Sequence, residues 1–285
     1  MSANFKNLSK DDADTYRLVL SSSGISHHVR KTEHGWDIQV KDADDEKAIG
    51  VVQHYLEENR EAPKTQAPQY YKYQRTYTGI WVSILLIALH VAITISGKSA
   101  YFIKTYGSSA FHILHGELYR SATSLMLHAD SLHLMGNIAG IAVFGTAVCT
   151  VMGWGMGWLM ILVSGMLGNL MNALLYESGH ISVGASTAIF GAIGILSAHQ
   201  FFKKFMQSGQ KIKAFLPLAS GLALLGILGS GAHSDVMAHL FGFLAGIVLG
   251  GLYSLCVNRP IIKEHQAGFI LLTIGVLALA WLRAF

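Results

Sequence analysis

The chain has 285 residues, of which 52% are hydrophobic and 13% are charged, and its formal net charge at pH 7 is +4. Soluble domains usually contain about a quarter of charged residues, so this composition excludes a purely water-soluble protein. The charges are also unevenly placed: 12 of the 17 acidic residues precede position 65, so a polar head is followed by an apolar body.

The polar head, residues 1–66, is predicted to be a small α+β domain that ends in a linker. The predicted elements are helices over 11–22 and 42–59 and strands over 25–29 and 36–40. The two strands would form a hairpin that turns near Gly35. The linker is predicted over 61–69, which contains two prolines.

The apolar body, residues 67–285, contains charge-free runs that are long enough to cross a hydrocarbon core, for which roughly 20 helical residues suffice. The stretch 131–176 is long enough for two spans, which would turn at the glycines of 152–157. Seven spans are predicted, approximately over 78–97, 131–152, 154–176, 184–202, 214–229, 236–257 and 267–282. The sequence therefore predicts an all-α polytopic membrane domain.

The basic residues predict the orientation, because short loops that carry Lys and Arg are retained in the cytoplasm. With the head inside, the inner flanks hold Lys72, Arg75, Lys203, Lys204, Lys211, Lys213, Arg259 and Lys263, and the outer flanks hold Lys98, Lys104, Arg120 and Arg283. We therefore expect a cytoplasmic head and an outer C-terminus. Retention of these basic loops in the cytoplasm already explains the positive net charge, so no nucleic-acid partner is expected.

The two cysteines, Cys149 and Cys256, lie near the predicted inner ends of two spans, so we expect no structural disulfide.

Polar residues inside the spans are informative, because a hydrogen-bonding side chain in hydrocarbon needs a partner or a cavity. Three groups stand out, at 133–137, 184–191 and 238–242. At about 1.5 Å per residue, Ser186 and His239 lie roughly 25 and 30 Å above the predicted inner flanks. By the same count Asn137 and His133 lie roughly 24 and 30 Å above the inner turn. Polar residues that served only helix packing would not be expected to lie at similar depths on three helices.

These residues suggest nucleophilic chemistry. A serine hydroxyl attacks a carbonyl once a histidine takes its proton, and the oxyanion that forms needs hydrogen-bond donors. Ser186 and His239 meet the first requirement. His133 and Asn137 carry donor side chains, and Ser186 lies in the first turn of its predicted helix, where backbone N–H groups lack an intrahelical acceptor.

Short motifs in these groups resemble the rhomboid intramembrane serine proteases. The motifs are His133-x-x-x-Asn137, Gly184-x-Ser186 with Phe190-Gly191, and Ala238-His239-x-x-Gly242. The resemblance covers a six-helix core at about 75–258, and Tyr119-Arg120 and His128 also suit the family pattern. The head is similar to the cytoplasmic domain of the bacterial GlpG-type members, and a seventh C-terminal span is similar to the forms with one helix after the core.

The resemblance implies a serine endopeptidase of the inner membrane that cleaves transmembrane segments of other proteins near the outer leaflet. Ser186 would be the nucleophile and His239 the general base and then acid. His133, Asn137 and the Ser186 amide would form the oxyanion hole, and Phe190 would support the His239 ring. Substrates would enter laterally from the lipid past span five, and no metal or other cofactor is expected. Thr187 stands where many members have glycine.

Two other interpretations were weighed. A transporter or channel usually needs intramembrane carboxylates, and none of the seven predicted spans contains Asp or Glu, which disfavours that class. A pseudoprotease that binds membrane-protein clients without cutting them is the alternative. Asp130 and Asp235 precede the two histidines closely, and we interpret both as helix N-caps rather than as the acid of a catalytic triad.

Overall fold

The structure is a computed structural model that describes residues 3–59, 76–207, 211–229, 231, 234–257 and 263–285. The chain divides into two compact units, Met1–Tyr70 and Tyr71–Phe285. The predicted linker over 61–69 and the basic residues Lys72, Arg75 and Arg259 lie outside the described residues.

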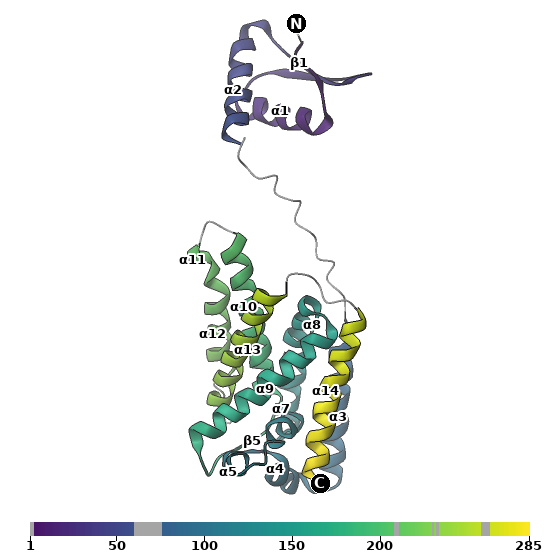
Figure 1. Cartoon of the computed structure of the whole chain (residues 1–285), viewed down its shortest axis with the longest axis vertical. Helices are drawn as coiled ribbons and strands as arrows, with labels where there is room; N and C mark the ends of the chain where they lie inside the picture. The colour runs from purple at the N-terminus through teal and green to yellow at the C-terminus, as the bar shows by residue number, and fades with distance from the viewer. Residues whose placement is uncertain (1–2, 60–75, 208–210, 230, 232–233, 258–262) are drawn as a thin grey trace. The chain divides into compact units, whose positions relative to one another are not determined.

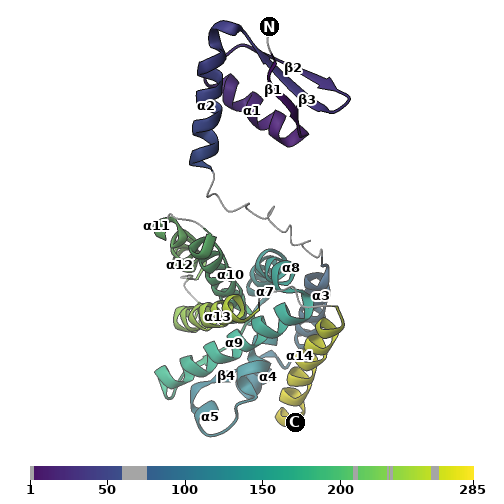
Figure 2. The same cartoon turned by 45° about the horizontal axis from the view of Figure 1, so that its top comes forward.

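The N-terminal unit is a three-stranded antiparallel sheet covered by two helices (Figure 2). Its elements are β1 (Ala3–Leu8), α1 (Lys10–Ser22), β2 (His27–Thr32), β3 (Gly35–Val40), the short helix η1 (Asp42–Asp44) and α2 (Asp45–Glu58). The strand order is β1-β3-β2. The core of this unit contains Leu20, Ile38 and Val52. The predicted helices and hairpin are confirmed, but the first strand of the hairpin lies at 27–32 rather than 25–29. β1 was not predicted, because its two large apolar residues, Phe5 and Leu8, do not alternate along the strand. Its pairing with β3 is also irregular, with two shifts of register.

The second unit is a helical bundle that contains a helix at each of the seven predicted spans (Figure 1). These are α3 (Thr78–Ile95), the span α7–η3–α8, α9 (Trp154–Tyr176), α10 (Ser186–Gln207), α12 (Leu216–Leu228), α13 (Val236–Cys256) and α14 (Lys263–Ala284). In the second span, a π-helical turn, η3 (Ile141–Gly145), interrupts the α-helix between α7 (Ser131–Gly140) and α8 (Thr146–Met152). The short helix α11 (Lys211–Ala214) precedes α12.

Six helices in the described part of the chain are long and apolar enough to cross a membrane, and α10 is the predicted span that is not among them. Its 22 residues include Ser186, Thr187, Ser197, His199, Gln200 and Lys203. α10 packs against α9, α12 and α13, and its contact with α13 is the most extensive between any two elements. Protein rather than lipid surrounds this helix, so it does not need an apolar surface.

The segment between α3 and α7 folds into short elements at one end of the bundle. They are α4 (Ser99–Tyr106), β4 (Ser108–Ser109), α5 (Ala110–Leu114), α6 (Arg120–Thr123) and η2 (Ser124–Met126). The buried Arg120 holds this segment together, because it donates hydrogen bonds to Glu117 and to the Lys104 carbonyl. β4 pairs with β5 (Ile181–Ser182), which precedes α10.

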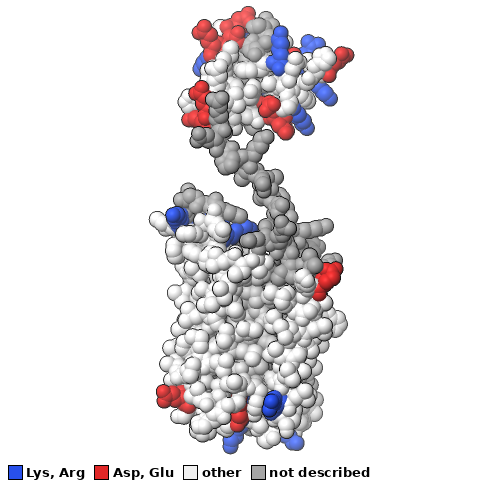
Figure 3. All heavy atoms as spheres, in the orientation of Figure 1, with Lys and Arg blue, Asp and Glu red and all other residues white. Residues whose placement is uncertain are grey.

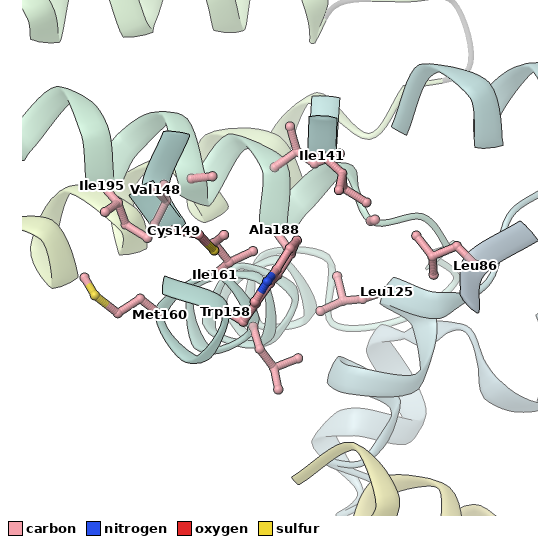
Figure 4. Packing of buried hydrophobic residues seen from close by; sticks show 14 of the residues in the cluster. Leu86, Leu125, Ile141, Val148, Cys149, Trp158, Met160, Ile161, Ala188 and Ile195 are labelled. Carbon is pink, nitrogen blue, oxygen red and sulfur yellow. The ribbon is translucent and has the colours of Figure 1, made fainter. Parts of the chain in front are cut away.

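The main core lies where α8, α9 and α10 meet, and Val148, Ile161 and Ala188 pack there (Figure 4). The outer surface of this unit carries exposed apolar side chains, and in the view of Figure 3 a broad band of it is free of Lys, Arg, Asp and Glu. Lipid tails rather than water suit such a surface. The chain is a multi-pass membrane protein.

Candidate active site

Ser186 and His239 lie within hydrogen-bonding distance on two different helices. Ser186 is the first residue of α10, His239 lies in the first turn of α13, and 2.8 Å separates Ser186 Oγ from His239 Nε2. The two helices approach closely because glycines line their contact: a Cβ atom at Gly246 would collide with the Gly191 carbonyl. His239 is 5% exposed and Ser186 is half-buried, so the pair lies inside the bundle.

The environment of His239 determines which of its two ring nitrogens can accept a hydrogen bond. Its Nδ1 lies 3.2 Å from the Gly229 carbonyl oxygen, which can only accept a hydrogen bond. The neutral ring therefore carries its proton on Nδ1, and Nε2 is left to accept the Ser186 hydroxyl proton. The Phe190 ring lies against the imidazole, with centroids 4.6 Å apart. A backbone carbonyl and an aromatic ring thus orient this histidine.

His133 and Asn137 of α7 lie beside Gly184, two residues before Ser186. A Cβ atom at Gly184 would lie 2.6 Å from His133 Nε2 and 3.4 Å from Asn137 Nδ2. Gly184 also has a φ of +126°, a backbone conformation that favours glycine. Only a residue without a side chain fits here. The backbone of the chain two residues before Ser186 therefore passes directly under the two α7 side chains.

The Asn137 side chain has an unused donor. Asn137 is 4% exposed, and its buried Nδ2 atom has no hydrogen-bond partner in the structure. A buried amide without a partner loses free energy relative to water, so such a group in a native protein calls for an explanation. Its position beside Gly184 and near the N-terminus of α10 supplies one, because an oxyanion bound there would accept its hydrogen bond.

The Thr187 side chain lies against glycines of two neighbouring helices. A Cβ atom at Gly168 of α9 would lie 2.6 Å from Thr187 Cγ2, and one at Gly242 of α13 would lie 3.0 Å from it. The threonine methyl group therefore fills a space that two glycines on neighbouring helices leave open. It packs between α9, α10 and α13.

Both aspartates that precede the histidines are N-caps, as predicted. Asp130 accepts a hydrogen bond from His133 N and Asp235 from Ala238 N. The Asp235 carboxylate does not serve the His239 ring: its Oδ2 atom accepts hydrogen bonds from His180 Nε2 at 2.6 Å and from Asn172 Nδ2 at 2.7 Å.

The structure adds His128 to the surroundings of His133. Their rings lie edge to face with centroids 5.4 Å apart, and both ring nitrogens of His128 are buried without a partner. Burial, together with the charges of His133 and His90, lowers the pKa of His128 to about 4. The sequence placed His128 in the family pattern but not against His133. Cys149 and Cys256 are both free thiols, as predicted.

Comparisons with known proteins point to one family. A profile of the rhomboid domain matches residues 115–256. The chain is 30% identical to the "Putative rhomboid protease YdcA" of Bacillus subtilis over 154 residues, which cover 54% of this chain and 73% of that relative.

Two further relatives match over smaller shares of their own length. The chain is 28% identical to the "Rhomboid protease GluP" of Bacillus subtilis over 67% of this chain and 38% of that protein. It is 31% identical to "RHOMBOID-like protein 1" of Arabidopsis thaliana over 48% of this chain and 35% of that protein. The profile spans the part of the bundle that contains Ser186 and His239, and the chain belongs to the rhomboid family.

Proposed function

We propose that the protein is an intramembrane serine endopeptidase in which Ser186 is the nucleophile and His239 the general base and acid. The observation that carries the proposal is the 2.8 Å contact between Ser186 Oγ and His239 Nε2 inside a membrane bundle. A hydroxyl next to the accepting nitrogen of a neutral imidazole is the arrangement that activates a serine.

The steps follow from the contacts. Ser186 Oγ attacks the scissile carbonyl as its proton passes to His239 Nε2, and the Gly229 carbonyl stabilises the imidazolium through Nδ1–H. The oxyanion accepts hydrogen bonds from Asn137, His133 and the Ser186 backbone N–H. His239 then donates its proton to the leaving amine. Water hydrolyses the acyl-enzyme by the same steps, with His239 again as base.

The substrates are transmembrane segments of other proteins, which reach Ser186 from the lipid. α12 is the helix that would move to admit them, since it buries only Gly221 and Leu225 completely and packs mainly on α10. A scissile carbonyl in an intact helix is already hydrogen-bonded, so segments that unwind readily near the cut are the preferred substrates.

We infer that residues 1–66 form a cytoplasmic domain with its linker and that 67–285 form the membrane domain, with its core at about 75–258. Lys203, Lys204, Lys211 and Lys213 lie around α11, at the end of the bundle away from Ser186. Retention of these lysines in the cytoplasm places the dyad toward the outer leaflet of an inner membrane. The relatives YdcA and GluP are bacterial, which supports this membrane.

The test is cleavage of a tagged transmembrane substrate in proteoliposomes, with Ser186→Ala and His239→Ala compared at equal folded amounts. We expect the wild type to cut and both variants to lose at least about 10³-fold in rate. A fluorophosphonate should label the wild type and not Ser186→Ala. A wild type that neither cuts several substrates nor reacts with the probe would favour the pseudoprotease.

A further inference from the structure

Asp235 joins three segments of the chain at one end of the bundle. Its Oδ1 atom accepts a hydrogen bond from Ala238 N and so caps α13, while its Oδ2 atom accepts from Asn172 of α9 and from His180. Burial alone raises the pKa of Asp235, but the hydrogen bonds from His180 and Ala238 N outweigh it, and the pKa lies below its usual value. The carboxylate is therefore ionised at neutral pH.

The position of Asp235 relative to His239 is fixed by the first turn of α13. His239 N donates to the Asp235 carbonyl at 3.1 Å, so the two residues are one helical turn apart. The His239 ring itself bonds to Gly229 and lies within reach of Ser186. The Asp235 carboxylate makes no hydrogen bond to the imidazole, so it can orient the ring only through the placement of α13.

His180 is held from the opposite side. Its ring stacks on Tyr176, with centroids 4.1 Å apart, and its carbonyl accepts a hydrogen bond from Ala110 N at 3.0 Å. The next residues form β5, which pairs with β4, and Gly184 N donates to the Ser124 carbonyl. The backbone from His180 to the start of α10 is thus anchored to the segment between α3 and α7.

These contacts connect the two members of the dyad through two segments of the chain that meet at the Asp235–His180 hydrogen bond. We call this connection the tie and the two segments its arms. One arm runs from Asp235 along the first turn of α13 to His239, and the other runs from His180 through β5 and Gly184 to Ser186. The glycine contacts between α10 and α13 hold the helices together deeper in the bundle. The Asp235–His180 contact closes the tie on the other side of the dyad.

We propose that Asp235 is a positioning residue: by bonding His180 and Asn172 it holds the start of α13 in register with the segment that leads into α10, and so keeps His239 Nε2 within hydrogen-bonding distance of Ser186 Oγ. This role rests on the proposed protease function. A loosened tie shifts the imidazole rather than the substrate, so it lowers kcat and leaves KM unchanged.

The conservative variant separates positioning from triad chemistry. Asp235→Asn keeps an acceptor oxygen for the N-cap, but its amide nitrogen cannot accept from Asn172 and His180, so kcat should fall no further than in Asp235→Ala. Asp235→Ala removes the N-cap and the contacts with Asn172 and His180, and it should lower kcat about 10- to 100-fold. An acid that served the imidazole as in soluble serine proteases would instead lose roughly 10⁴-fold as asparagine.

The experiment measures kcat and KM for a transmembrane substrate in proteoliposomes, and the rate of fluorophosphonate labelling, per folded protein and well below the unfolding temperature. The variants are Asp235→Asn, Asp235→Ala, His180→Gln and the double variant Asp235→Ala/His180→Gln. Both single changes break the same contact, between Asp235 and His180. The double variant should therefore lose no more rate than Asp235→Ala alone. Glu177→Gln is the matched control, since it removes an exposed acid from the same connection.

Each outcome of this experiment either supports the positioning role of Asp235 or refutes it. Equal labelling rates for Asp235→Ala and the wild type would refute the positioning role while the protease function stands. Losses that appear only in KM, or in stability without a change in labelling, would refute it as well. A loss of about 10⁴-fold in Asp235→Asn would make Asp235 a triad acid instead. A wild type that neither cuts nor labels would refute the protease function, and the positioning role with it.

Discussion

Gln266 of the last helix is predicted to be required for the stability of the bundle. α9 begins after Gly153, which has no side chain to cap the first N–H groups of that helix. Gln266 Oε1 accepts from Gly155 N at 2.8 Å and from Met156 N at 3.0 Å, and its Nε2 donates to the Met152 carbonyl at 3.3 Å. One side chain from α14 thus caps α9 and the end of α8 together.

Gln266→Leu removes these three hydrogen bonds and keeps the volume of the side chain. Gln266 is 1% exposed, so water does not replace the lost partners. Side-chain hydrogen bonds in membrane proteins contribute about 0.6 kcal/mol on average and about 1.7 at most. Three of them give an expected loss of about 2–5 kcal/mol in the free energy of unfolding.

The assay is the free energy of unfolding in bicelles by steric trapping. Leu271→Ala is the control, because Leu271 lies on the same helix and is 68% exposed to the lipid side; its loss should stay near 0.5 kcal/mol. Gly155→Ala should also destabilise, since a Cβ atom there would collide with the Gln266 carbonyl. A Gln266→Leu protein as stable as the control would show that the cap contributes nothing.

Three other outcomes are expected. Thr187→Gly should cost about 1 kcal/mol in thermal unfolding without loss of fluorophosphonate labelling, because the lost methyl group packs against Gly168 and Gly242; a folded variant that no longer labels would contradict this expectation. Gly184→Ala should lower the cleavage rate roughly 10²- to 10³-fold, as loss of an oxyanion donor does, whereas Gly179→Ala, also at positive φ but with open space around it, should cut at nearly the wild-type rate. The low pKa of His128, about 4, means that the unfolded chain binds the proton more readily between pH 4 and 6.5. Stability should therefore be complete above pH 6.5 and fall by up to about 3 kcal/mol toward pH 4, and His128→Gln should flatten this slope in unfolding measured against pH.

The sequence was a good guide to the helices and to the proximity of the key polar residues. Charge-free runs gave the ends of α9 and α13 within a residue, because hydrocarbon allows few polar side chains. Helical rise alone placed Ser186 and His239 at one depth, and the structure brings them to 2.8 Å. Their catalytic roles stay a prediction.

Other contacts could not be predicted, because they join residues far apart in sequence through single side chains. Gln266 and Gly155 are 111 positions apart, and no periodicity relates them. Asp235 had the sequence of an N-cap, but nothing in the sequence showed that its second oxygen bonds His180. The direction of Thr187 was also open until Gly168 and Gly242 were seen to leave space for its methyl group.

The π-helical turn η3 separates two halves of one span that face different neighbours. His133 and Asn137 lie before it and face Gly184, whereas Val148 and Cys149 lie after it and face the core with α9. Each residue rotates a helix by about 100°, so the extra residue of a π turn offsets the two faces by about that angle. Deleting one residue within Ile141–Gly145 would restore a regular helix and turn either His133 and Asn137 or the core residues out of place. In this span, the number of residues matters as much as their identity.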